Sequence, residues 1–98
     1  MDKILIITGG TSGLGLELIR DAISRGYYVC NLARNKEKMA KLDSEFTDNY
    51  KGFIGDVTDD EFIKNSIAEI SKLGNIYCLI NCAEKAYFKK HLYMKQMK

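Results

Sequence analysis

Apolar residues occur along this chain in two alternating patterns. Continuous apolar runs, typical of strands buried on both faces of a sheet, lie at residues 3–8, 27–32, within 51–57 and at 76–81. Between them, apolar residues recur at helical spacing over residues 13–26, 35–46 and 58–70. Helices between successive strands are typical of a parallel sheet with right-handed crossovers, so the pattern predicts an α/β fold of order β-α-β-α-β-α-β. Thr58 and Glu61 have the spacing of a capping box, and we expect the third helix to begin there.

A glycine-rich segment, TGGTSGLG at Thr8–Gly15, joins the first strand to the first helix. This arrangement is typical of a phosphate site, because unpaired amides and the helix dipole favour an anion at the helix start. In this interpretation Gly9 permits a tight turn, Gly13 lets the backbone approach a pyrophosphate, and Gly15 lets the helix pack closely on the sheet. A plain structural turn is the alternative, and an ATP or GTP loop is disfavoured because no Gly-Lys-Ser/Thr follows. The predicted cofactor-binding residues of this segment are Gly9, Thr11, Ser12, Gly13, Leu14 and Gly15.

Three motifs resemble those of the short-chain dehydrogenase/reductase family. The glycine segment has the family's TGxxxGxG spacing, GDVTD at Gly55–Asp59 resembles its Asp-Val pair, and INCAE at Ile80–Glu84 resembles its Asn-Asn-Ala-Gly motif. They occur in the family's order, each at a strand end, over residues 3–84. The resemblance implies a Rossmann-type, doubly wound parallel sheet with strand order 3-2-1-4, truncated after about four strands.

The resemblance also implies roles for the residues after the third and fourth strands. The Asp56 side chain would meet the adenine amino group beside Val57, and Asn81 and Ala83 would border the adenosine side of the cofactor. Asp56 could instead cap a turn, and Asn81 could instead bond the backbone at the strand end. Glu84 departs from the family glycine, and its carboxylate would repel a pyrophosphate unless it turns into solvent.

The residues after the second strand bear on the choice of dinucleotide. Folds that prefer NAD place an acid about 20 residues beyond the loop to bond the ribose hydroxyls. Here Ala33 occupies that place and Arg34 follows. An arginine can bind the 2′-phosphate of NADP through a charge-assisted fork. We therefore predict NADP(H) as the cofactor, with NAD(H) possible.

Charge divides the chain into two parts. Residues 1–83 carry ten Lys/Arg and twelve Asp/Glu, whereas residues 84–98 carry five lysines and one glutamate, within a net charge of +2. We interpret residues 1–83 as a dinucleotide-binding half-domain and residues 84–98 as a basic tail, either a short helix or frayed. The tail has no arginine and the chain has no recognition motif, so nucleic-acid binding is not expected.

The family's reaction is hydride transfer between a nicotinamide and a carbonyl or alcohol. It uses a serine, a tyrosine as general acid/base, and a lysine four residues after that tyrosine. None of the six tyrosines here has a lysine at that position. We therefore expect the cofactor-binding half of such an oxidoreductase, lacking its catalytic residues and inactive alone. The alternatives are a non-catalytic nucleotide-binding or regulatory protein, and a small interaction protein that acts through the basic tail.

Composition excludes several other classes. Three cysteines and one histidine give neither a disulfide framework nor a zinc site, so no metal is expected. The longest apolar run, Ile4–Ile7, is too short for a membrane span, and a cytoplasmic location is expected by default. The fourth strand would lie at an exposed edge, which predicts possible self-association through that edge.

Overall fold

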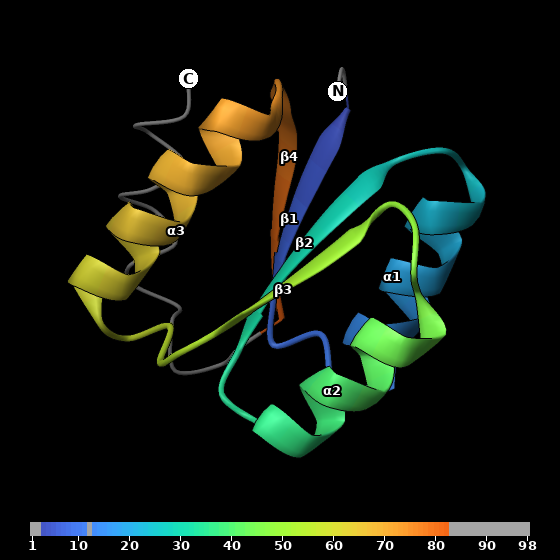
Figure 1. Ribbon diagram of the computed structural model, residues 1–98, viewed down its shortest axis with the longest axis horizontal. Coiled ribbons are helices and arrows are strands. Elements are labelled where there is room, and N and C mark those ends of the chain that lie inside the picture. The colour runs from blue at the N-terminus through green and yellow to red at the C-terminus, as the bar shows by residue number, and fades with distance from the viewer. Residues whose placement is uncertain (1–2, 12, 83–98) are drawn as a thin grey trace.

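The computed structural model describes residues 3–11 and 13–82 of the chain. Its elements are β1 (Ile4–Thr8), α1 (Gly13–Ser24), β2 (Tyr28–Ala33), α2 (Lys36–Glu45), β3 (Tyr50–Ile54), α3 (Asp60–Leu73) and β4 (Ile76–Asn81). The strands form one parallel sheet in the order β3-β2-β1-β4. Helices α1 and α2 cover one face and α3 covers the other (Figure 1). The predicted doubly wound α/β fold with order 3-2-1-4 is confirmed.

Two hydrophobic cores, one on each face, explain why the strand sequences are continuously apolar. Successive residues of β1 point to opposite faces. Ile4 and Ile6 join the core beneath α3, and Leu5 and Ile7 join the core beneath α1 and α2. All five residues of β1 are buried. A central strand covered on both faces therefore shows no polar alternation.

The helix starts differ in how they are capped. Asp59 caps α3 by accepting a hydrogen bond from the Glu61 amide at 3.0 Å. The predicted start at Thr58 is therefore wrong by one residue, because the Thr58 amide and hydroxyl instead donate to Oδ1 of Asp56. Asn35 caps α2 by accepting from the Lys38 amide at 2.9 Å. The first turn of α1 contains no acidic residue.

The β4 side of the sheet is less covered than its centre. Among the described residues β4 pairs with β1 alone, and most of its side chains are half-buried. Tyr77 is 63% exposed. Self-association at this edge stays a prediction. No helix within residues 3–11 and 13–82 is long and apolar enough to span a membrane.

Some predicted features lie outside the described residues. They are Ser12, Ala83, Glu84 and the whole basic tail at 84–98. The division into a half-domain at residues 1–83 and a tail at 84–98 therefore also stays a prediction.

Candidate functional site

The carboxyl ends of the four parallel strands lie along one edge of the sheet. In open α/β sheets ligands bind at that edge, where the strand order changes direction. Here the change lies between β1 and β4, because β2 and β3 extend the sheet on the opposite side of β1. The predicted residues follow the strand ends: Gly9, Thr11, Gly13, Leu14 and Gly15 after β1, Arg34 after β2, Asp56 and Val57 after β3, and Asn81 at the end of β4. The topology thus brings the described members of the predicted site to one edge.

The backbone of the glycine loop has two residues in the left-handed region. Gly9 has φ of 73° and Gly13 has φ of 58°, values that favour glycine because it has no Cβ. The Gly9 amide donates to the Leu32 carbonyl at 2.9 Å, which attaches the start of the loop to β2. A Cβ placed on Gly13 would have nothing within 4 Å. Among the described residues, the space on the Cβ side of Gly13 is therefore open.

Gly15 allows a close contact, although with a different neighbour from the predicted one. A Cβ at Gly15 would lie 2.8 Å from Gly10 Cα and 2.9 Å from the Gly9 carbonyl oxygen. The nearest neighbours of Gly15 thus belong to the loop that precedes α1. At Gly10 a Cβ would lie 2.7 Å from Ile19 Cδ1 and 2.9 Å from Asn31 Oδ1. Sequence reasoning missed Gly10, which looked like one glycine among several.

A buried polar group supports the loop from β2. Asn31 is fully buried, and its Oδ1 accepts a hydrogen bond from the Gly10 amide at 3.1 Å. Its Nδ2 donates to the Tyr50 hydroxyl at 3.2 Å, and that hydroxyl donates to Met39 Sδ at 3.0 Å. Burial, the largest cause, raises the pKa of Tyr50 to about 12. Asn31 was also missed, and its only sequence signal is a lone amide inside the apolar run YVCNLA.

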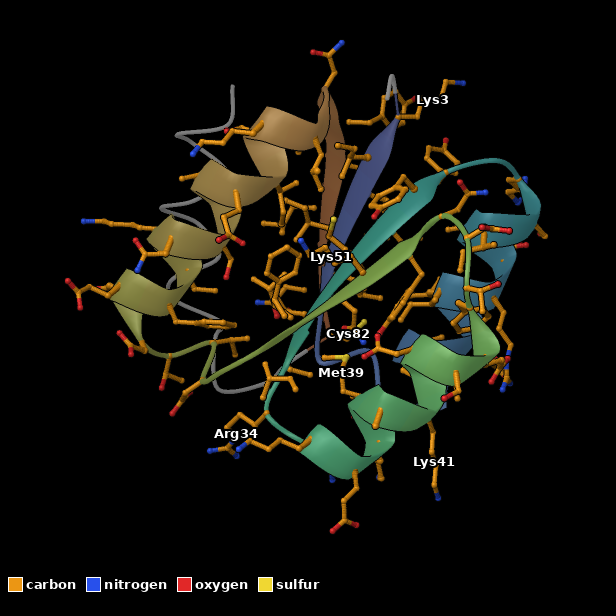
Figure 2. All side chains as sticks on the ribbon, in the orientation of Figure 1. Lys3, Arg34, Met39, Lys41, Lys51 and Cys82 are labelled. Atoms are coloured by element: carbon orange, nitrogen blue, oxygen red, sulfur yellow. The ribbon has the colours of Figure 1, made fainter. Side chains whose placement is uncertain are left out.

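Arg34 and Asp56 lie close together beyond the ends of β2 and β3. The Gly55 amide donates to the Ala33 carbonyl at 3.0 Å and holds the two chain segments side by side. Arg34 Nη1 is 3.9 Å from Asp56 Oδ2, and both side chains are about half exposed. Figure 2 shows Arg34 at the junction of β2 and α2, extending away from the sheet. An ion pair this exposed contributes little to stability.

Asp56 and its neighbour Val57 also have roles in the fold. Asp56 Oδ1 accepts hydrogen bonds from the Thr58 amide at 2.9 Å and the Thr58 hydroxyl at 2.7 Å. The turn-capping alternative for Asp56 is therefore present, while its second oxygen faces Arg34. The Val57 side chain is buried in the core beneath α3.

The end of β4 is attached to the end of β1. The Thr8 hydroxyl donates to Asn81 Oδ1 at 2.6 Å, and the Cys82 amide donates to the Thr8 carbonyl at 3.0 Å. Because Thr8 is buried, this bond directs the side-chain oxygen of Asn81 toward β1 at the end of the sheet. The Asn81 side chain thus bonds the neighbouring strand through a threonine hydroxyl. Leu14, in the first turn of α1, is 69% exposed at the same edge.

Comparison with known proteins gives one consistent family. The sequence profile described as short chain dehydrogenase matches residues 3–97. A 1,2-dihydroxy-1,2-dihydronaphthalene dehydrogenase of Pseudomonas putida is 42% identical over 82 residues, covering 80% of this chain and 30% of the relative. A 3-oxoacyl-[acyl-carrier-protein] reductase of Bos taurus is 31% identical, covering 85% of this chain and 35% of the relative. The chain thus spans about a third of the length of the curated relatives it matches.

Solved structures agree in fold. A short chain dehydrogenase from Bacillus anthracis has a TM-score of 0.77 at 32% identity, with 83% of this chain and 34% of that chain covered. Actinorhodin polyketide ketoreductase with NADPH has a TM-score of 0.75 at 28% identity, with 84% and 33% covered. Each aligns with the described sheet and helices over only part of its own length. The chain belongs to the short-chain dehydrogenase family.

Proposed function

We propose that these residues form the NADP(H)-binding part of an oxidoreductase that transfers hydride between a nicotinamide and a carbonyl or alcohol. The observation that carries the proposal is the glycine loop at the start of α1. Gly13 has a left-handed φ and open space where a Cβ would stand, and no acid occurs in the first turn of the helix. The family supports a dinucleotide cofactor, because its members bind NAD(P)(H).

The pyrophosphate is assigned to the loop and the first turn of α1. Helix-start amides have no partner inside the helix, and the helix dipole adds partial positive charge there. Gly9 would make the turn, as its φ of 73° indicates, and the loop residues proposed for the contact itself are Thr11, Ser12, Gly13, Leu14 and Gly15. The absence of a carboxylate in the first turn of α1 removes one source of repulsion.

The adenosine end is assigned to the residues beyond β2, β3 and β4. The Asp56 side chain would contact the adenine beside Val57, and Asn81 with Ala83 would border the adenosine. Preference for NADP(H) rests on Arg34, whose side chain is 63% exposed and whose exposed pair with Asp56, at 3.9 Å, is weak. A phosphate offers Arg34 a bidentate, charge-assisted partner, so the side chain can turn from the carboxylate to the 2′-phosphate.

When bound, the nicotinamide supplies or accepts the hydride. The residues of this chain hold and orient the dinucleotide, and no catalytic residue is assigned among residues 1–98. The whole protein's reaction is proposed from its family.

Titration of the chain with NADPH and with NADH, followed by cofactor fluorescence or calorimetry, tests the proposal. We expect NADPH to bind more tightly than NADH, and Arg34→Ala to weaken NADPH binding about tenfold, as for loss of one charged hydrogen bond. Arg25→Ala is the matched control. Arg25 is an exposed arginine just after the C-terminal end of α1, far from the glycine loop in sequence, and it pairs with Asp21 at 2.9 Å. Equal loss in both variants would contradict a specific role for Arg34. Millimolar or absent binding of both cofactors to a folded chain would overturn the proposal and favour a non-catalytic interaction protein.

A further inference from the structure

Asn31 is a polar side chain in an otherwise apolar environment. It lies in β2 with no exposed surface, among core residues beneath α1 and α2 that include Val29 and Ala33. Burial of an amide is unfavourable unless its hydrogen bonds are satisfied. Among the described residues, no buried side-chain nitrogen or oxygen lacks a hydrogen-bond partner. An apolar side chain at this position would need no such partners. The hydrogen-bond partners of the amide therefore indicate what the polar side chain contributes.

The neighbours of Asn31 determine which way its amide points. The Gly10 amide can only donate a hydrogen bond, so the atom facing it at 3.1 Å must be Oδ1. On the other side, Nδ2 donates to the Tyr50 hydroxyl, whose proton is directed to Met39 Sδ. Figure 2 shows Met39 on α2, which packs over this face of the sheet. The orientation of the amide is therefore fixed from β3 and α2.

Two consecutive amides of the glycine loop are thereby held against β2. The Gly9 amide donates to the Leu32 carbonyl at 2.9 Å, and the Gly10 amide donates to Asn31 at 3.1 Å. Both amides are consumed by the protein. Backbone amides that bind an anion at this edge must therefore come later in the loop or from the first turn of α1. The position of those amides depends on the turn that Gly9 and Gly10 make.

We propose that Asn31 is a positioning residue for the cofactor pyrophosphate, which it serves by fixing the glycine loop through the Gly10 amide. This inference rests on the proposed function of the loop. Asn31 does not touch the ligand. It holds the free chain in the binding conformation, so that less conformational freedom is lost when the dinucleotide binds. Tyr50 and Met39 hold Asn31 in turn.

The test compares two variants of the same buried network. Asn31→Leu keeps the size and burial of the side chain but removes the acceptor for Gly10. Tyr50→Phe removes the hydroxyl that supports Asn31 and leaves the bond to Gly10 in place. We expect Asn31→Leu to weaken NADPH binding about tenfold or more. It should also lower the melting temperature, because the buried Gly10 amide is left without an acceptor, so Tyr50→Phe serves as the destabilised control that keeps this bond. Tyr50→Phe should lower the melting temperature and change the dissociation constant by about twofold at most.

Hydrogen exchange at the Gly10 amide separates a positioning role from a general loss of stability, because it reports on the bond to Asn31 directly. In the wild-type chain without cofactor, the Gly10 amide should be protected from exchange. That protection should disappear in Asn31→Leu and persist in Tyr50→Phe. An unprotected Gly10 amide in the wild type would overturn the inference even if Asn31→Leu fails to fold.

The outcomes separate this inference from the proposed function. If the wild type binds NADPH and Asn31→Leu binds it equally well, the positioning role is wrong and the proposed function stands. If the folded wild type does not bind NADPH, the proposed function fails and the cofactor role of Asn31 fails with it. In that case Gly10 protection still reports whether Asn31 fixes the loop.

Discussion

The substitution Gly15→Ala has two opposing effects. Alanine is favoured over glycine in a helix, but its Cβ would crowd the loop before α1. Gly15 is buried in the first turn of α1. An added Cβ would lie 2.8 Å from Gly10 Cα and 2.9 Å from the Gly9 carbonyl oxygen. Both neighbours are backbone atoms, so the conflict can be relieved only if the loop or the helix start moves. The substitution therefore acts directly on the conformation that the proposed function requires.

The magnitude follows from two opposing effects. Alanine is favoured over glycine in a helix by about 1 kcal/mol. Overpacking costs about 1–3 kcal/mol, and the rigid neighbours place this site in the upper part of that range. A net loss of about 1–2 kcal/mol should lower the melting temperature by roughly 5–10 °C for a domain of this size. Displacement of the loop should also weaken NADPH binding by about tenfold.

Thermal unfolding followed by circular dichroism, together with NADPH titration, checks both effects. Gly26→Ala serves as a control, because Gly26 has φ of 92°, lies beyond the other end of α1 and has nothing within 4 Å of an added Cβ. That variant should lose about 1–2 kcal/mol through backbone strain alone and keep its NADPH affinity. A higher melting temperature in Gly15→Ala than in the wild type would refute the reasoning.

Two further substitutions test the described network and the strand ends. The free energy of unfolding should fall between about pH 9 and pH 12. Burial raises the pKa of Tyr50 and of Cys30 to about 12, so over this range the folded chain keeps protons that the unfolded chain releases. Urea unfolding at stepped pH should show a smaller fall in Tyr50→Phe, and an identical fall would contradict the assignment to Tyr50. Thr8→Val should lower stability by about 1 kcal/mol, since it removes the buried donor to Asn81 at 2.6 Å; urea unfolding that matches the wild type would show that this bond contributes nothing.

The fold was predictable because the signals that specify it are local. The apolar run of β1 and the helical spacing after Gly13 are visible in short windows, and short strands separated by helices leave few topologies open. The placement of the predicted residues at one edge of the sheet was predictable as well, because the ends of parallel strands determine that edge. The start of α3 was misplaced because Thr58 and Asp59 are both good capping residues. Only the turn around Asp56, whose carboxylate accepts from Thr58, decides between them.

The supporting network was not predictable, because its members are distant in sequence. Asn31 lies 21 residues from Gly10 and 19 residues from Tyr50. Their contact depends on the register between β2 and β3, in which Asn31 is paired with Gly52, and on the close approach of the loop to β2. No local pattern encodes either. A polar residue inside an apolar strand is the one mark that such a network leaves in the sequence.

The central claim is that the glycine loop and the carboxyl edge of the sheet bind a dinucleotide. Titration of the isotope-labelled chain with NADPH, followed through its backbone amide resonances, tests this directly. The account predicts saturable shifts concentrated at residues 9–15, near Arg34 and Asp56, and at Asn81. The amide resonances of Lys3, Tyr27 and Tyr77, whose side chains meet at the opposite end of the strands, should stay unchanged. Saturable shifts confined to that opposite end, or none in a folded chain at millimolar NADPH, would contradict the account.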